Sequence, residues 1–184
     1  MKISKIICAG FGGQGVMSMG RLIAYTGMLE NQEVSWLPSY GPEMRGGTAN
    51  CNVIVSDHSI GSPVISKDAD AAIVMNLPSM RKFEPELVPG GLLVVNTSLI
   101  DAKPMRDDIE IVEVRANEIA TEVGNAKAAN MVMLGAYIGV SGLFEIDSVL
   151  EALKKVFGPK KAAFLEVNRN ALNRGRELVA HHVS

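Results

Sequence analysis

A glycine-rich turn between an apolar run and a helical pattern constrains the fold of this chain more than any other stretch. Residues 3–8 form a short apolar run typical of a buried strand, and residues 16–29 place apolar side chains at helical spacing. The connection between them holds four glycines, Gly10, Gly12, Gly13 and Gly15. Their G-x-G-x-x-G spacing predicts a tight strand-to-helix turn, at which backbone N–H groups can approach an anionic group closely.

The rest of the chain continues the alternation of strands and helices. Further strands are predicted at residues 33–37, 48–56, 69–75, 92–96 and 109–114, and helices at 79–87, 117–123, 130–143, 148–156 and 160–182. Pro38 is expected to end the second strand, residues 63–65 to return as a hairpin strand, and Asp147 or Ser148 to cap the helix that follows. This order predicts an α/β fold in a single domain over residues 1–184. We expect a mostly parallel, Rossmann-like sheet flanked by helices, with a β-hairpin excursion and a helical C-terminus.

Composition and charge argue against several classes of protein. The net charge of −2, with no basic stripe before the C-terminal segment, gives no reason to expect nucleic-acid binding. The longest apolar run, residues 131–144, contains three glycines and is too short to span a membrane. The N-terminus leads directly into a strand without the apolar core of a secretory signal, so a cytoplasmic location is expected. Cys8 and Cys51 stand far apart, which fits a reducing compartment and provides no zinc or iron–sulfur ligand set.

The glycine turn by itself does not identify a ligand. A dinucleotide site needs a carboxylate at the end of the second strand to hold the ribose hydroxyls, and here that strand ends at Leu37 and Pro38. A nicotinamide-dependent dehydrogenase is therefore disfavoured. Gln14 suits a loop that presents an amide. A tight turn without any ligand is the alternative, because isolated matches to this motif are often structural.

A second glycine-rich segment, residues 38–47, follows about two dozen residues later. It combines the hydroxyl of Ser39, the phenol of Tyr40, the carboxylate of Glu43 and the guanidinium of Arg45. Arg45 can hold a phosphate or carboxylate in a bidentate manner, whereas an ion pair with Glu43 is the structural alternative.

Polar residues also follow the later strands at the same predicted edge of the sheet. Asn76 ends one strand, and Thr97 and Ser98 end the next, with helix capping as the alternative role and the favoured one for Ser98. We predict no catalytic and no metal-ligating residue in this chain. The predicted cofactor-binding residues are Gly10, Gly12, Gly13, Gln14, Gly15, Ser39, Tyr40, Gly41, Glu43, Arg45, Gly46 and Asn76.

Together, the two glycine-rich segments resemble those of a known family. The chain is similar to the gamma subunit of 2-oxoacid:ferredoxin oxidoreductases, the pyruvate/ketoisovalerate oxidoreductase gamma family, and the resemblance extends through residues 70–76, 89–91 and 130–142. The Glu43-Met44-Arg45 form most resembles the 2-oxoglutarate enzymes.

This resemblance implies a non-autonomous subunit of an enzyme. The family oxidatively decarboxylates a 2-oxoacid with thiamine diphosphate, passes electrons through iron–sulfur clusters to ferredoxin, and transfers the acyl group to coenzyme A. Thiamine diphosphate, Mg and the clusters are expected in partner alpha, beta and delta subunits, because this chain has neither a GDG…N thiamine motif nor a cysteine cluster. Coenzyme A contact by the glycine turn and Arg45 is a hypothesis.

Three other interpretations remain open at this point. The chain can be a purely structural assembly subunit of the same complex, or the small subunit of an indolepyruvate-type oxidoreductase. An independent nucleotide-binding oxidoreductase is disfavoured by the missing carboxylate. Apolar helix surfaces favour a homodimer when the partner chains are absent.

Overall fold

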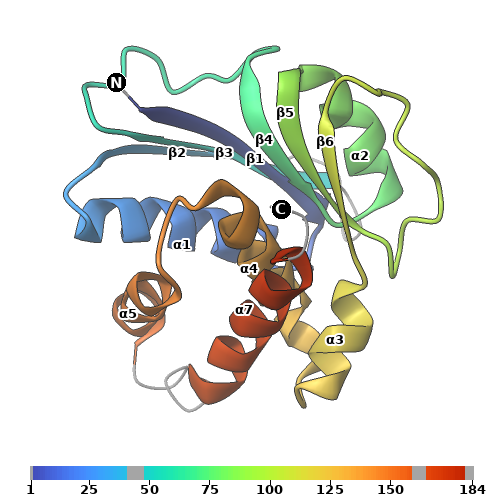
Figure 1. The fold of residues 1–184 in the computed structure, drawn as a ribbon. Helices are drawn as coiled ribbons and strands as arrows, with labels where there is room; N and C mark the ends of the chain where they lie inside the picture. The colour runs from blue at the N-terminus through green and yellow to red at the C-terminus, as the bar shows by residue number, and fades with distance from the viewer. Residues whose placement is uncertain (1, 41–47, 159–164, 181–184) are drawn as a thin grey trace.

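The computed structural model describes residues 2–40, 48–158 and 165–180, and its centre is a six-stranded sheet (Figure 1). The strands lie in the order β2-β3-β1-β4-β5-β6. Their bounds are β1 Ile3–Phe11, β2 Glu33–Tyr40, β3 Thr48–Ser56, β4 Ala69–Val74, β5 Leu87–Asn96 and β6 Glu110–Val114. Strands β1, β4, β5 and β6 run parallel to their neighbours in that series, whereas β3 is antiparallel to both β1 and β2. The predicted mostly parallel α/β sheet is confirmed, and the structure shows that it is mixed.

Helices cover both faces of this sheet. Their bounds are α1 Val16–Leu29, α2 Leu77–Phe83, α3 Ala116–Glu122, α4 Ala129–Ser141, α5 Ile146–Phe157 and α7 Leu165–Val179, with short 3-10 turns at Glu84–Glu86 and Ala126–Ala128. Helices α1, α4, α5 and α7 gather on one face, and α2 lies on the other (Figure 1). The helical C-terminal part is confirmed over the described residues.

The core consists of two clusters because successive strand residues point to opposite faces. In β1, Ile6 and Cys8 belong to the large cluster under α1 and α4, whereas Ile7 and Ala9 belong to the smaller cluster under α2. Within the described ranges, no helix is both long enough and apolar enough to cross a membrane.

The predicted hairpin between residues 48–56 and 63–65 is wrong. Strand β3 forms a hairpin with β2 and then pairs on its other side with β1, from Phe11 opposite Thr48 to Ile3 opposite Ser56. Ile65 is not in a strand; it is buried against the smaller core cluster, which explains its apolar character. Periodicity predicted the strands correctly but did not decide which of them pair, because pairing depends on contacts far apart in sequence.

Pro38 does not end β2 as predicted, because the strand continues to Tyr40. Strand β2 lies at the edge of the sheet, where the N–H group that proline lacks is not needed for a ladder bond.

Two further element starts differ from the prediction. Strand β5 begins at Leu87 rather than at residue 92, with a register shift against β4 and Gly90 at φ 75°. Helix α5 begins one residue before Asp147, with Glu145 at its N-cap, so the predicted cap is also wrong.

Cys8 and Cys51 lie directly opposite each other on β1 and β3, and both are fully buried. The hydrogen bond between the two side chains, followed by burial, raises the pKa of the Cys8 thiol well above its usual value. Because both side chains are inaccessible to the reagent, we predict that neither thiol reacts with dithionitrobenzoate in the native protein and that both react after denaturation in guanidinium chloride. Rapid reaction of a thiol in the native protein would contradict this packing.

Candidate functional site

The glycine turn connects the end of β1 to the start of α1, as predicted. The backbone N–H of Gln14 donates to the carbonyl of Phe11 at 3.1 Å, and Gly15 is the N-cap of α1 with φ 77°. Gly13 also has a positive φ, of 93°. The first N–H groups of a helix have no partner in an earlier turn, so the start of α1 presents backbone donors toward this loop.

Two of the glycines are required by neighbouring side chains. A Cβ atom at Gly10 would lie 2.7 Å from Oε1 of Gln14 and 2.9 Å from Cβ of Met75. A Cβ atom at Gly15 would lie 2.5 Å from Nδ2 of Asn130. Asn130 belongs to α4, and its Nδ2 donates to the carbonyl of Gly15 at 3.1 Å. By contrast, a Cβ atom at Gly12 would meet nothing within 4 Å.

The side chain of Gln14 folds back onto the strands. Its Oε1 accepts a hydrogen bond from the backbone N–H of Phe11 at 2.6 Å and a second from Nδ2 of Asn76 at 3.2 Å. Asn76 is 3% exposed and is also the N-cap of α2, since its Oδ1 accepts from the N–H of Ser79 at 2.9 Å. The structure therefore brings Gln14 and Asn76 together and gives Asn76 the capping role named as its alternative.

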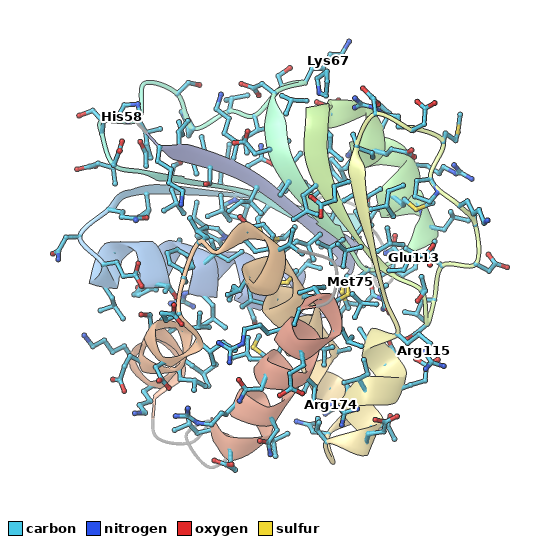
Figure 2. The ribbon with its side chains drawn as sticks, viewed as in Figure 1. His58, Lys67, Met75, Glu113, Arg115 and Arg174 are labelled. Carbon is cyan, nitrogen blue, oxygen red and sulfur yellow. The ribbon has the colours of Figure 1, made fainter. Side chains whose placement is uncertain are left out.

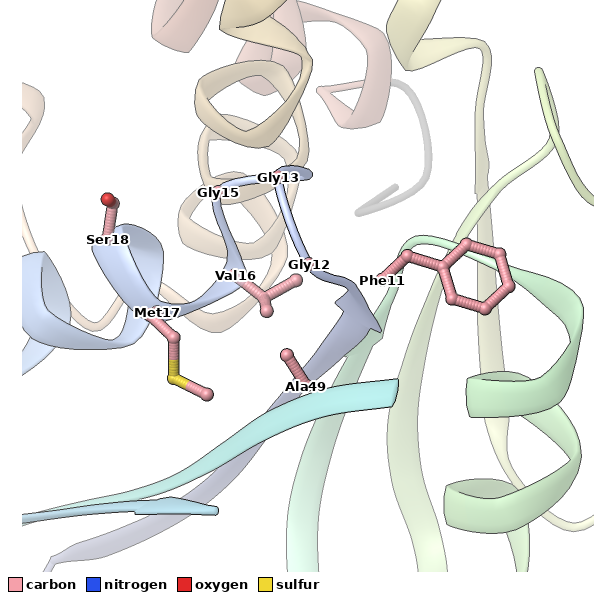
Figure 3. A pocket seen from close by; sticks show the side chains of 8 residues that line it. All are labelled: Phe11, Gly12, Gly13, Gly15, Val16, Met17, Ser18 and Ala49. Atoms are coloured by element: carbon pink, nitrogen blue, oxygen red, sulfur yellow. The ribbon is translucent and has the colours of Figure 1, made fainter. Parts of the chain in front are cut away.

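A pocket of about 380 Å³ lies between the glycine turn, the first turn of α1 and the start of β3 (Figure 3). Its lining residues are Phe11, Gly12, Gly13, Gly15, Val16, Met17, Ser18 and Ala49. Three predicted glycines line it, whereas Gly10, Gln14 and Asn76 do not. Among the residues that the structure describes, the pocket walls are apolar side chains, backbone and one hydroxyl, without a titratable group.

Sequence reasoning missed five lining residues: Phe11, Val16, Met17, Ser18 and Ala49. All but Ala49 lie directly before, within or after the glycine turn, so their position next to the glycines was a usable signal. Ala49 reaches the pocket only because β3 pairs with β1, and nothing local in the sequence indicates that pairing.

The strands on either side of residues 41–47, β2 and β3, end and begin at the same edge of the sheet as the glycine turn. Phe11 is opposite Thr48, and Tyr40 is opposite Ala49. Ser39 is exposed near the end of β2. Four predicted site residues lie outside the described residues: Gly41, Glu43, Arg45 and Gly46.

Ser98 has the structural role in a turn and at a helix start that was favoured for it over ligand binding. Its N–H donates to Oδ1 of Asn96 at 3.3 Å, and its Oγ accepts from the N–H of Asn117 at 2.9 Å. The Ser98 hydroxyl also donates to Glu118, and this hydrogen bond is the main cause that lowers the pKa of that carboxyl group. Ser98 therefore joins β5 to the start of α3.

His58 lies far from this edge. It follows β3, whose last residue Ser56 is opposite Ile3 at the start of β1, and it is distant from Met75 at the other end of the sheet (Figure 2). Its ring contacts Ser56 and Asp57. Within the residues that the structure describes, no group of three or more His, Cys, Asp or Glu side chains has the geometry of a metal site.

Comparison with known proteins identifies the family. The sequence model of the pyruvate ferredoxin/flavodoxin oxidoreductase family matches residues 5–178. The chain belongs to this family. It is 36% identical over 181 residues to the ketoisovalerate oxidoreductase subunit VorA of Methanothermobacter thermautotrophicus. That alignment covers 97% of this chain but only 37% of VorA, so this chain spans little more than a third of that relative. It is 33% identical over 186 residues to the 2-oxoglutarate synthase subunit KorC of the same organism, covering 95% and 94% of the two chains.

Solved structures share this fold, and one of them is a gamma subunit. The gamma subunit of a keto/oxoacid ferredoxin oxidoreductase from Geobacter sulfurreducens superposes with a TM-score of 0.82 at 28% identity, covering 97% of this chain and 99% of the other. A 2-oxoglutarate:ferredoxin oxidoreductase from Magnetococcus marinus shares the fold with a TM-score of 0.87 at 24% identity, covering 98% of this chain and 32% of that chain. The family chain therefore occurs both as a separate subunit and as about a third of longer chains.

Proposed function

We propose that this gamma-type chain is part of a 2-oxoacid:ferredoxin oxidoreductase complex and supplies one wall of its coenzyme A site. The observation that carries the proposal is the pocket at the glycine turn, which joins the open N-terminus of α1 to apolar walls. Helix N-termini of this kind bind phosphate groups through backbone N–H donors and the helix dipole.

The complex performs the oxidative decarboxylation of a 2-oxoacid, and this chain contributes binding rather than electron transfer. Thiamine diphosphate, Mg and iron–sulfur clusters belong to partner alpha, beta and delta subunits, and ferredoxin accepts the electrons. The alignment with KorC, which covers 94% of that protein, supports a separate subunit and 2-oxoglutarate as the substrate, whereas the similarity to VorA supports ketoisovalerate.

Initial rates of the complex with a panel of 2-oxoacids distinguish these two substrates. We expect kcat/KM to be highest for 2-oxoglutarate.

Coenzyme A fits the chemistry of this pocket. Its phosphates are anionic acceptors for the backbone donors at the start of α1, and its aliphatic pantetheine arm suits the apolar surfaces of Val16, Met17 and Ala49. A pocket of about 380 Å³ lies at the lower end of the range for drug-sized ligands, so it holds only part of so large a molecule. Arg45 and the partner chains complete the site. The Magnetococcus enzyme with a similar fold was solved with 2-oxoglutarate, coenzyme A and succinyl-CoA bound, which supports this assignment.

The test compares a double variant with a matched control in the assembled complex. Gly13→Val, Arg45→Ala removes the positive-φ glycine and the proposed phosphate-binding cation, and is expected to raise the KM for coenzyme A by about tenfold or more, with little change in the KM for the 2-oxoacid. The control Gly61→Val, Arg81→Ala alters a glycine with open space around it and an exposed arginine, and both KM values should stay unchanged. An unchanged KM for coenzyme A in an assembled Gly13→Val, Arg45→Ala complex would refute the proposal.

One observation favours a second candidate, a structural assembly subunit without a ligand. Gly10 and Gly15 are already required by Gln14 and Asn130, so the glycine spacing does not need a ligand to explain it. In that case the double variant would weaken assembly with the partner chains, measured by size-exclusion chromatography, and leave the coenzyme A KM of the remaining complex unchanged. A cytoplasmic location and self-association of the isolated chain stay predictions.

A further inference from the structure

Hydrogen bonds through two side-chain amides join the glycine turn to the start of α2. Two backbone N–H groups determine which amide atom donates and which accepts in each of these bonds. The N–H of Phe11 can only donate, so the atom of Gln14 facing it is Oε1. The N–H of Ser79 likewise requires Oδ1 of Asn76. The remaining atom of Asn76, Nδ2, therefore donates to Oε1 of Gln14. Neither amide can be turned over without placing two donors or two acceptors against each other.

This arrangement excludes direct ligand contact by Asn76. The residue is 3% exposed, and both ends of its amide are already paired within the protein. Any effect of Asn76 on the glycine turn must therefore act through Gln14, its partner 62 residues away in sequence.

The same arrangement leaves one group of Gln14 for a ligand. Both hydrogen bonds that the described residues make to its amide end on Oε1, so Nε2 remains as a donor on the partly exposed side chain. Gln14 does not itself line the pocket, but it lies between Gly13 and Gly15, which both do, and its side chain is partly exposed. A donor at this place suits a ligand group that only accepts, such as a phosphate or carbonyl oxygen.

We propose that Asn76 is a positioning residue that fixes Gln14, so that the glycine turn keeps its shape and Nε2 of Gln14 donates to an acceptor oxygen of the bound ligand. This inference rests on the proposed coenzyme A site and adds Asn76 as the residue that fixes which amide atom of Gln14 is available to the ligand. The two roles are distinct. Gln14 contacts the ligand, and Asn76 acts only through Gln14.

Three variants, assayed in the assembled complex, test the inference. Gln14→Glu keeps an oxygen for Phe11 and Asn76 but replaces the Nε2 donor by an anionic acceptor. It is expected to raise the KM for coenzyme A at least about tenfold, more at low salt, with kcat nearly unchanged. Asn76→Asp keeps the cap on Ser79 but sets a carboxylate oxygen against Oε1 of Gln14, and a rise of about fivefold to tenfold in the KM for coenzyme A is expected.

Asn96→Asp is the matched control. Asn96 is also a fully buried asparagine at a strand end, but it pairs with Asn117 and Ser98 instead of the glycine turn, so the KM should not change.

A double-mutant cycle decides whether Asn76 acts through Gln14. In a Gln14→Ala background, adding Asn76→Asp should leave the coenzyme A KM unchanged, whereas an additive effect would overturn the positioning role. An unchanged KM in Gln14→Glu would overturn the donor role, and this variant keeps the test decisive if Asn76→Asp does not fold. If the Gly13→Val, Arg45→Ala variant raises the KM while the Gln14 and Asn76 variants do not, this inference fails and the proposed function stands. If none of them changes the KM, the coenzyme A site itself fails.

Discussion

A Gly175→Ala variant is expected to unfold at a temperature about 4–8 °C below that of the unchanged chain, although alanine is the better helix former by about 1 kcal/mol. The reason is the contact between α7 and α4. A Cβ atom at Gly175 would overlap the carbonyl oxygen of Val132 and lie 2.8 Å from the backbone N of Ala136. Both neighbours are backbone atoms of α4, which cannot turn aside as a side chain can. The helices must move apart, and overpacking of this kind costs about 3 kcal/mol.

The contact is reciprocal, which gives the prediction its control. A Cβ atom at Gly135 on α4 would overlap the carbonyl oxygen of Leu172 on α7, so Gly135→Ala should destabilise the protein similarly. Asn170→Ala, on the exposed side of α7, should leave the melting temperature within about 2 °C. Thermal unfolding followed by circular dichroism measures all three. A melting temperature of Gly175→Ala equal to or above that of the unchanged chain would show that the two helices do not pack through these glycines.

A Gly15→Val variant is expected to lose about 3 kcal/mol of unfolding free energy and to abolish the tight binding of coenzyme A proposed for the complex. Two physical causes add. Gly15 has φ 77°, a backbone conformation in which a β-branched residue is strained. Its Cβ atom would also lie 2.5 Å from Nδ2 of Asn130, the group that donates to the Gly15 carbonyl. The variant must move the turn away from α4, and the pocket wall moves with it.

Companion variants separate the two causes. Asn130→Ala removes the amide that a side chain at position 15 would meet, so part of the Gly15→Val loss should disappear in the Gly15→Val, Asn130→Ala double variant, leaving about 1–2 kcal/mol for the backbone conformation. Gly12→Ala is the matched control within the turn, because a Cβ atom there meets nothing within 4 Å. Urea unfolding gives the free energies. Equal stability of Gly15→Val and Gly12→Ala would contradict the described turn.

Much of the fold could be predicted because it follows from local periodicity. Helix α1 and strand β3 have the predicted bounds, since one shows apolar residues at helical spacing and the other is rich in β-branched residues between turn signals. The glycine turn was predictable for the same reason. The positive φ at positions 13 and 15 favours glycine, and the change from strand to helix is visible in the periodicity of the flanking residues.

For the site, the sequence indicated only what depends on the turn itself. Gly12, Gly13 and Gly15 line the pocket, and their contact with a cofactor stays a prediction. Asn76 was named as a ligand contact together with Gln14, whereas the structure buries Asn76 and pairs it with Gln14, whose own ligand contact stays a prediction. A strand-end asparagine looks the same in sequence whether it faces a ligand, caps a helix or holds a distant glutamine.

By itself, then, the sequence determined the elements, their order, the family and the glycine turn between β1 and α1. Tertiary structure alone decided that β3 enters the sheet between β2 and β1, that Ala49 reaches the pocket, and that Asn76 fixes Gln14. The physical reason is the range of the interactions. Helical spacing and glycine conformations act within a few residues, whereas strand pairing and buried hydrogen bonds join residues dozens of positions apart and form only when the whole chain has packed.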